Sequence, residues 1–158
     1  MRFAYADPPY LGQGKKLYGF PEWDSLERHA AFVQQLQTEY PDGWAMSASS
    51  PSLRSILPIC PETCRVAAWV KPFAIFKPNV NPAYAWEPVI FNGGRKRDRS
   101  KPTVRDWFSH NITLKKGLTG AKPEAFCRWI FDLLGAEKGD TFDDLFPGTG
   151  VFGKTWAA

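Results

Sequence analysis

The sequence lacks the features that mark several classes of protein. It contains only three cysteines, an odd number that argues against a framework of disulfides and for a reducing compartment. No stretch approaches the roughly 18 consecutive apolar residues that a membrane-spanning helix needs. The N-terminus also lacks the long apolar segment of a secretory signal. These absences predict a cytoplasmic protein without a membrane partner.

Apolar residues are plentiful by contrast, and charge is unevenly distributed. The 44% of hydrophobic and 15% of aromatic residues exclude global disorder, and 158 residues suit a single domain. Between Gly93 and Lys116 the chain has eight basic and two acidic residues, a charge of +6, whereas the whole chain carries +4. We therefore expect residues 1–158 to form one domain with a basic insertion at about 93–118 that faces a polyanion.

Short apolar segments alternate with segments of helical periodicity along the chain. The apolar segments predict strands at residues 2–6, 44–48, 64–70, 86–91 and 141–146. The periodic segments predict helices at about 25–40, 51–57, 122–134 and 151–156, with an irregular loop at 11–21. This alternation is typical of an α/β fold, in which a mostly parallel sheet of about five strands is flanked by helices.

The first motif, Asp7-Pro8-Pro9-Tyr10, follows the first predicted strand. The exocyclic amine of a nucleobase is a poor nucleophile because its lone pair is delocalised into the ring. A carboxylate from Asp7 and a carbonyl from Pro8 could accept its two N–H groups, and the prolines would fix the backbone between these acceptors. Tyr10 could stack on a base that has left its helix. A plain turn that ends the strand is the alternative interpretation.

The second motif spans residues 144–150 and contains Asp144, Phe146, Pro147, Gly148, Thr149 and Gly150. A strand that runs into a Gly-x-Gly turn and then a helix allows a ligand to approach the backbone closely. Continued to Lys154-Thr155, the segment also has the spacing of a phosphate-binding loop, which leaves a nucleotide hydrolase as an alternative. Both motifs follow predicted strands, so we expect them to share one crevice at the carboxyl ends of those strands.

Together the two motifs resemble those of the amino-directed adenine methyltransferases that use S-adenosylmethionine (SAM). In that family an Asp-Pro-Pro-Tyr motif holds the target amine, and an Asp-x-Phe-x-Gly-x-Gly motif holds the cofactor. The order of the motifs is similar to that of the permuted class of DNA adenine methyltransferases, which includes short phage-encoded forms. Lys122-Pro123 matches the pair that opens the helix before the cofactor strand. Trp69-Val70-Lys71 and Glu87 are also similar to a pattern in the eukaryotic mRNA adenosine methyltransferases.

The resemblance implies a Rossmann-like methyltransferase fold, permuted and truncated. It also implies methyl transfer from SAM to the N6 amine of adenine in DNA, by direct displacement on a flipped base. It assigns catalysis to Asp7, Pro8, Pro9 and Tyr10, and cofactor binding to Asp7, Lys122, Asp144, Phe146, Pro147, Gly148, Thr149 and Gly150. We assign nucleic-acid binding to Lys15, Lys16, Arg95, Lys96, Arg97, Arg99, Lys101 and Arg105, and we expect no metal site. Glu87 either orients a neighbour in the site or pairs with Lys71.

Larger members of that family hold the ribose hydroxyls of the cofactor with an acidic residue that has no counterpart at its usual place here. We therefore expect another segment, a second copy of the chain or a partner subunit to complete the cofactor site. The last predicted strand is expected at or near an edge of the sheet. Methylation of RNA adenosine or of cytosine N4 in DNA, and a catalytically silent nucleic-acid-binding subunit, are the alternative functions. The resemblance also points to a bacterial or phage-infected cell and to its nucleoid.

Overall fold

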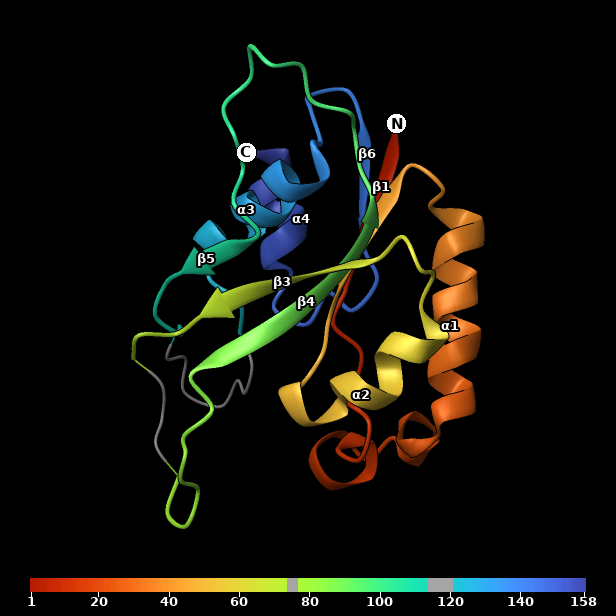
Figure 1. The fold of residues 1–158 in the computed structure, drawn as a ribbon, viewed down its shortest axis with the longest axis vertical. Coiled ribbons are helices and arrows are strands. Elements are labelled where there is room, and N and C mark those ends of the chain that lie inside the picture. The colour runs from red at the N-terminus through yellow and green to blue at the C-terminus, as the bar shows by residue number, and fades with distance from the viewer. Residues whose placement is uncertain (74–76, 114–120) are drawn as a thin grey trace.

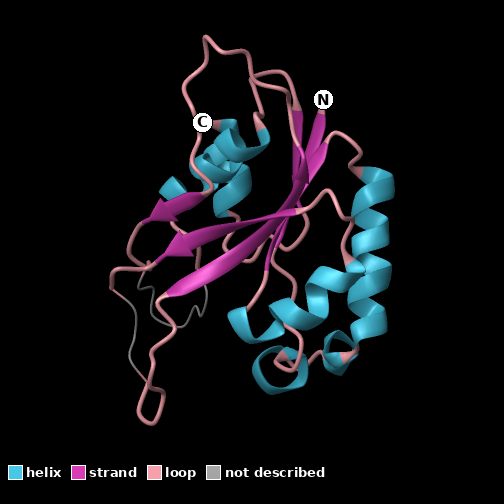
Figure 2. Ribbon diagram, in the orientation of Figure 1, coloured by secondary structure: helices cyan, strands magenta, loops and turns pink. Residues whose placement is uncertain are grey.

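The computed structural model describes residues 1–73, 77–113 and 121–158. They form one sheet of six strands between two layers of helices (Figures 1 and 2). The strands are β1 (Arg2–Ala6), β2 (Gly43–Ser47), β3 (Arg65–Val70), β4 (Trp86–Gly93), β5 (Trp107–Ser109) and β6 (Thr141–Asp144), in the spatial order β5-β3-β4-β2-β1-β6. The α-helices are α1 (Leu26–Glu39), α2 (Leu53–Ile56), α3 (Glu124–Leu134) and α4 (Val151–Ala157). Shorter helical turns are η1 (Gly14–Tyr18), η2 (Pro21–Asp24), η3 (Ser50–Ser52) and η4 (Leu57–Ile59).

The sheet is covered on both faces, as the apolar strands of the sequence require. Successive side chains of a strand point to opposite faces. In β1, Phe3 and Tyr5 pack in a core with α3 and α4, whereas Ala4 and Ala6 pack in a second core with α1. All four side chains are fully buried or nearly so. A strand buried on both faces is apolar throughout, and this explains why β1 has no polar alternation.

The two long helices predicted at about 25–40 and 122–134 are confirmed as α1 and α3. The hydroxyl of Ser25 accepts a hydrogen bond from the backbone N–H of Arg28 at 3.2 Å and so caps the start of α1. Gly135 follows α3 in the left-handed conformation, with φ of 66°, where a residue with a β-carbon would be strained. These two helices cover opposite faces of the sheet (Figure 1).

The α/β architecture is confirmed, but the sheet is larger and more mixed than predicted. Strand β4 is antiparallel to both β2 and β3, whereas the other three strand pairs are parallel. Parallel neighbours need a long crossover, usually a helix. Residues 71–85 join β3 to β4, and their described part contains no helix, so the chain returns antiparallel. The three-residue strand β5 is too short to produce a period in the sequence.

Two further expectations bear on the edges of the molecule. Strand β6 lies at one end of the strand order in the described sheet, as predicted for the last strand. Residues 11–21 were predicted to form an irregular loop, but they contain η1 and the start of η2. None of the helices in the described ranges has the length and apolar character needed to cross a membrane.

Candidate active site

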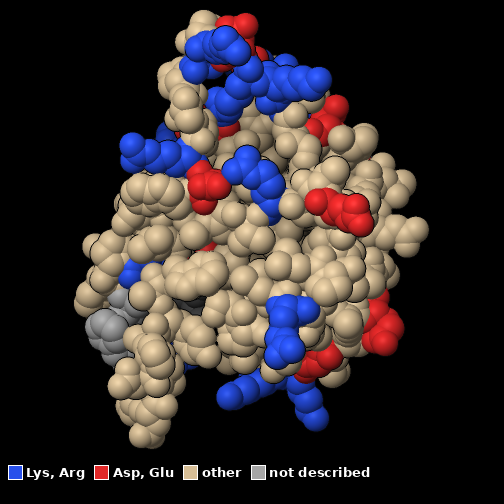
Figure 3. Space-filling view, viewed as in Figure 1, with Lys and Arg blue, Asp and Glu red and all other residues tan. Residues whose placement is uncertain are grey.

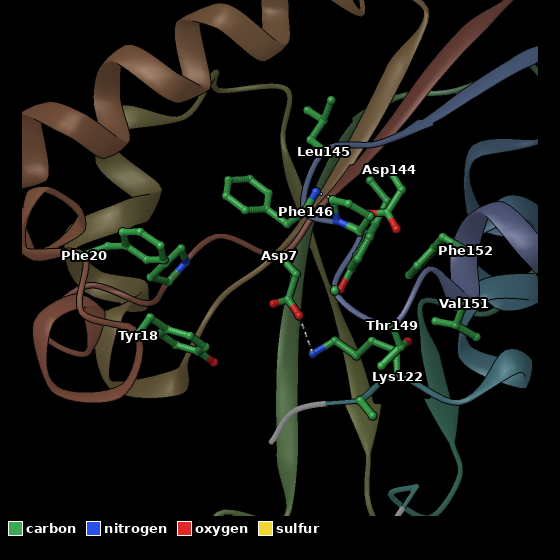
Figure 4. Close-up of a pocket in the computed structure, with 15 residues that line it drawn as sticks. Asp7, Tyr18, Phe20, Lys122, Asp144, Leu145, Phe146, Thr149, Val151 and Phe152 are labelled. Atoms are coloured by element: carbon green, nitrogen blue, oxygen red, sulfur yellow. Dashed lines mark hydrogen bonds and ion pairs between the residues drawn. The ribbon is translucent and has the colours of Figure 1, made fainter. Parts of the chain in front are cut away.

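A cavity of about 380 Å³ lies at the carboxyl ends of β1 and β6 (Figure 4). These strands are parallel neighbours, so the segments that follow them meet at the same edge of the sheet. Asp7 and Pro9 line the cavity after β1, and residues 144–149 line it at the end of β6. The prediction that the two motifs share one crevice is therefore confirmed. Pro8, Tyr10 and Gly150 lie next to these residues and are not part of the lining.

The turn after β6 uses glycine where the backbone requires it. Gly148 and Gly150 have positive φ angles of 45° and 70°, a region in which a β-carbon is strained. The Asp144 carboxylate accepts a hydrogen bond from the backbone N–H of Phe146 at 3.3 Å and so shapes the entry to the turn. Burial raises the pKa of Asp144. The cavity therefore has a half-buried acid beside a glycine turn.

The remaining walls of the cavity near β6 are aromatic. The rings of Tyr5 and Phe152 stack with their centroids 4.1 Å apart. Phe146 packs edge-on against Trp23 and Phe32, with both centroid distances 5.5 Å. These contacts fix the aromatic side chains before any ligand arrives. The cavity can thus take a ligand that combines an apolar or aromatic part with a positive charge near Asp144.

A network of charged side chains lies behind Asp7. The Lys122 ammonium is 3.1 Å from Asp7 Oδ2 and 2.6 Å from Glu87 Oε1. The Tyr10 hydroxyl donates to Glu87 Oε1 at 2.7 Å and approaches Asp7 Oδ1 at 3.2 Å. Lys71 pairs with the other oxygen of Glu87 at 3.3 Å. Two carboxylates therefore share one ammonium and one phenol.

Burial and the neighbouring opposite charges have opposite effects on the pKa values of Asp7, Glu87 and Lys122. Burial raises the pKa of Asp7, Lys122 lowers it, and Glu87 raises it again, so that the pKa stays above its usual value. Burial also acts to raise the pKa of Glu87, but Lys122 and Lys71 together outweigh it and lower that pKa. Burial acts to lower the pKa of Lys122, but the two carboxylates raise it beyond its usual value. Lys122 is therefore charged at neutral pH.

The structure gives Lys122 and Glu87 more specific positions than the sequence did. Lys122 was predicted to bind the cofactor. It does line the cavity, but its ammonium is held between Asp7 and Glu87. For Glu87 the sequence left open a role in the site or a pair with Lys71, and the structure shows contacts to Lys71, Lys122 and Tyr10 together.

Two aromatic residues that sequence reasoning did not assign, Tyr18 and Phe20, line the cavity on the side opposite α4 (Figure 4). They come from η1 and the residues after it. The Asp24 carboxylate accepts the backbone N–H groups of Gly14 and Lys15 at 2.7 and 3.0 Å and so fixes this turn. A β-carbon on Gly14 would collide with the carbonyl oxygen of Phe20. In the sequence, the available signal for this turn was the presence of Gly14 and Asp24 on either side of Tyr18.

The residues predicted to bind nucleic acid fall into two groups. Lys15 and Lys16 are exposed on η1, the turn that supplies Tyr18 to the cavity. The other group lies in the basic loop, residues 95–106, which follows the end of β4. There Arg95 donates to both oxygens of Asp140, at 2.8 and 2.6 Å. The N-terminal ammonium of Met1 donates to the same carboxylate at 2.7 Å.

The shared contact of Arg95 and Met1 with Asp140 places the basic loop beside the amino end of β1, whereas the cavity lies at the carboxyl end of that strand. Met1 precedes β1 and Asp7 follows it. The basic loop and the cavity are therefore separated by roughly the length of this five-residue strand, about 16 Å. Basic side chains gather over the loop that joins β4 to β5 (Figure 3). The exposed cations of the loop are Lys96, Arg97, Arg99, Lys101 and Arg105. The structure does not bring them to the cavity, and their contact with nucleic acid stays a prediction. Residues 114–118 of the expected insertion lie outside the described residues.

The arrangement of α4 does not favour a phosphate-binding loop. Thr155 is buried and donates its hydroxyl to the backbone carbonyl of Val151 at 2.7 Å. Lys154 is exposed and does not line the cavity. The two side chains that would hold a nucleotide phosphate and its metal are therefore directed elsewhere. In the described ranges, no group of three or more His, Cys, Asp or Glu side chains is placed to hold a metal ion.

Comparison with solved structures identifies the fold. The chain is similar to M1.HpyAVI in complex with SAM, with 18% sequence identity and a TM-score of 0.62 over 98% of this chain and 76% of that one. A second structure of M1.HpyAVI gives 16% identity and a TM-score of 0.60 over 98% and 75%. TTHA0409 of Thermus thermophilus, provisionally assigned as a DNA modification methylase, gives 16% identity and a TM-score of 0.52 over 96% and 74%.

The chain has a Rossmann-like methyltransferase fold. The likeness extends over almost all of its residues and over about three quarters of each neighbour. No protein-family model matches the sequence, and no curated protein matches it either. The fold is thus recognised through the arrangement of the backbone, at a sequence identity that by itself assigns no activity.

Proposed function

We propose that this protein is a SAM-dependent DNA methyltransferase that methylates the N6 amine of adenine by direct displacement on a flipped base. The observation that carries the proposal is the meeting of Asp7 and residues 147–149 of the glycine turn at one cavity. A carboxylate suited to hold an amine thus lies beside a turn suited to hold a cofactor. The methyltransferase fold, found in a neighbour solved with SAM, supports the same function.

The cavity fits SAM by size and by chemistry. Its volume of about 380 Å³ lies within the range of small-molecule pockets, roughly 300–1,000 Å³. Asp144 would attract the positively charged end of the cofactor, and the turn from Pro147 to Gly150 would let it approach the backbone. Phe146 would pack on its apolar part. When bound, SAM supplies an electrophilic methyl group on a sulfonium.

Asp7 would hold the target amine in line with that methyl group. Its carboxylate would accept one N–H of the amine, and the carbonyl of Pro8 would accept the other. No described residue donates a hydrogen bond to that carbonyl in the structure. Two fixed acceptors favour a pyramidal nitrogen, and they stabilise the positive charge that develops as the carbon–nitrogen bond forms. Tyr10, with Pro9 holding the backbone, would stack on the flipped base.

The first test is methyl transfer from labelled SAM to three nucleic acids of one sequence: duplex DNA, single-stranded DNA and RNA. The proposal predicts label in DNA, with duplex methylated at least as well as the single strand. Label in RNA alone would favour an RNA methyltransferase. Tight, salt-sensitive binding of DNA without transfer of label would favour a silent binding subunit.

We also propose that DNA contacts the protein at both ends of β1, near the cavity at its carboxyl end and at the basic loop near its amino end. Lys15 and Lys16 would contact phosphates beside the flipped base. Lys96, Arg97, Arg99, Lys101 and Arg105 would contact phosphates further along the duplex. Arg95 would support this loop through Asp140 without itself reaching DNA. The exposure of the loop cations and their distance from the cavity support this division.

Neutralising Lys96, Arg97 and Arg99 to Gln is expected to flatten the salt dependence of DNA binding. Each lost phosphate contact lowers the slope of log K against log salt by about 0.9, so the variant should lose about 3. Fluorescence anisotropy on a labelled duplex of two helical turns measures the slope. Arg128→Gln on α3 is the control, because Arg128 pairs with Glu124 at 2.6 Å on the helix surface. Equal slopes for the wild type and the loop variant would place the DNA elsewhere.

The proposal includes a partner for β6. This strand is an edge of the described sheet, and its outer backbone groups are free to pair with a strand of a second copy or of another subunit. Such pairing would bring new side chains to the cofactor turn that follows β6. Sedimentation of the protein with and without SAM and DNA measures this association.

A further inference from the structure

Glu87 occupies the centre of the charged network behind Asp7. Its Oε1 receives the Tyr10 hydroxyl at 2.7 Å and the Lys122 ammonium at 2.6 Å. Its Oε2 receives Lys71 at 3.3 Å. The Glu87 side chain is only 12% exposed and does not line the cavity. It therefore acts on a ligand of the cavity only through its neighbours.

The same two donors that reach Glu87 also reach Asp7, but less closely. Lys122 is 3.1 Å from Asp7 Oδ2, compared with 2.6 Å from Glu87. The Tyr10 hydroxyl is 3.2 Å from Asp7 Oδ1, compared with 2.7 Å from Glu87. Each donor therefore makes its shorter and stronger contact with Glu87. The carboxylate of Asp7 keeps capacity to accept a further N–H.

We propose that Glu87 is a positioning residue that holds Lys122 and Tyr10 away from Asp7 and so leaves the Asp7 carboxylate free to accept the target amine. The proposal rests on the proposed function for the identity of the amine. Without the Glu87 charge, Lys122 would close on Asp7 as a tight ion pair and occupy the oxygen that the amine needs. The Tyr10 ring would also lose the contact that fixes its plane.

Asp7 is surrounded by titratable groups from several elements. The test uses the direction in which each of them shifts the pKa of Asp7. They are Tyr5 on β1, Tyr10 on the same loop, Tyr18 on η1, Glu87 on β4, Lys122 before α3 and Asp144 on β6. Lys122 lowers the pKa of Asp7, whereas Glu87 raises it. Removal of the Glu87 charge should therefore lower the pKa of Asp7, and removal of the Lys122 charge should raise it.

The experiment follows the carboxyl ¹³C resonance of Asp7 through a pH titration, assigned with Asp7→Asn. Glu87→Gln should shift the midpoint to lower pH, and Lys122→Met should shift it to higher pH. Lys138→Met is the control, because Lys138 is exposed and does not line the cavity, so this variant should leave the midpoint unchanged. An unchanged midpoint in Glu87→Gln, or shifts of the same sign in Glu87→Gln and Lys122→Met, would overturn the inference.

The kinetic arm separates positioning from cofactor binding. Glu87→Gln should lower kcat by about 10²-fold, the cost of a misplaced reacting group, and leave the affinity for SAM within two-fold. Loss of SAM affinity with kcat unchanged would contradict the role. If Glu87→Gln does not fold, Tyr10→Phe tests the same network. It should lower kcat and raise the pKa of Asp7, because the Tyr10 hydroxyl lowers it.

The titration tests the role of Glu87, and the methyl-transfer assay tests the proposed function, so either one can be refuted without the other. The ¹³C titration uses the protein alone, so it reads the network even if no nucleic acid is methylated. Absence of methyl transfer by the wild type would refute the proposed function and leave the titration result standing. If the wild type transfers methyl groups but Glu87→Gln leaves the titration midpoint of Asp7 unchanged, the inference is refuted and the proposed function stands.

Discussion

Replacement of Asp7 by Asn is expected to lower the rate of methyl transfer by about 10³-fold while SAM still binds with affinity within a few-fold of the wild type. Asn keeps the shape of the side chain but offers a neutral acceptor, so the positive charge that develops on the amine nitrogen is no longer balanced. Lys122 keeps its shorter contact with Glu87, which should preserve the fold. Single-turnover transfer from labelled SAM measures the rate, and calorimetry measures the affinity.

Asp143→Asn is the matched control for this loss. Asp143 directly precedes Asp144 in β6, but it pairs with Arg2 at 2.8 Å and accepts the Tyr40 hydroxyl at 2.9 Å. It does not line the cavity. We expect this variant to methylate at close to the wild-type rate. If Asp7→Asn also retained normal turnover, Asp7 could not be the acceptor of the amine.

Replacement of Lys122 by Met is expected to destabilise the protein by about 3 kcal/mol at neutral pH. The Lys122 side chain is 6% exposed, and its removal leaves Asp7 and Glu87 as buried carboxylates with Lys71 as their remaining cation. The pKa of Asp7 then rises further, so the folded variant binds a proton that the unfolded chain has released. The lost stability should therefore return as the pH falls through that raised pKa. Urea unfolding at pH 7.5 and pH 5 measures this difference.

Two further variants separate the charge effect from loss of packing. Lys138→Met removes an exposed lysine and should change the free energy of unfolding by no more than about 0.5 kcal/mol. The double variant Lys122→Met with Glu87→Gln removes one ammonium and one carboxylate, and should recover part of the stability at pH 7.5. A loss of equal size at both pH values, with no recovery in the double variant, would assign the effect to packing.

The parts of the site that follow a strand directly could be predicted from the sequence. Asp7 and Pro8 come after a short apolar run that predicts a buried strand, and Gly148 and Gly150 follow another. Parallel strands carry such segments to the same edge, so local patterns were enough to bring together residues far apart in the chain. Helical periodicity likewise predicted helices at about 25–40 and 122–134, where the structure has α1 and α3.

The position of the basic loop depended on strand direction, which the sequence did not contain. Strand β4 runs antiparallel to β2, so its carboxyl end lies at the edge where β1 begins. The loop that follows β4 is therefore far from Asp7. Strand β5 extends over three residues only and gave no pattern. Contacts among Tyr10, Glu87 and Lys122 bring together three segments, and no local pattern encodes such a meeting.

The most direct test of the central claim is identification of the atom that receives the methyl group. Duplex DNA is incubated with the protein and SAM, digested to nucleosides and analysed by mass spectrometry, with Asp7→Asn in parallel. The account predicts N6-methyladenine with the wild type and about 10³-fold less with the variant. N4-methylcytosine as the product, or N6-methyladenine in equal amount from both proteins, would contradict it.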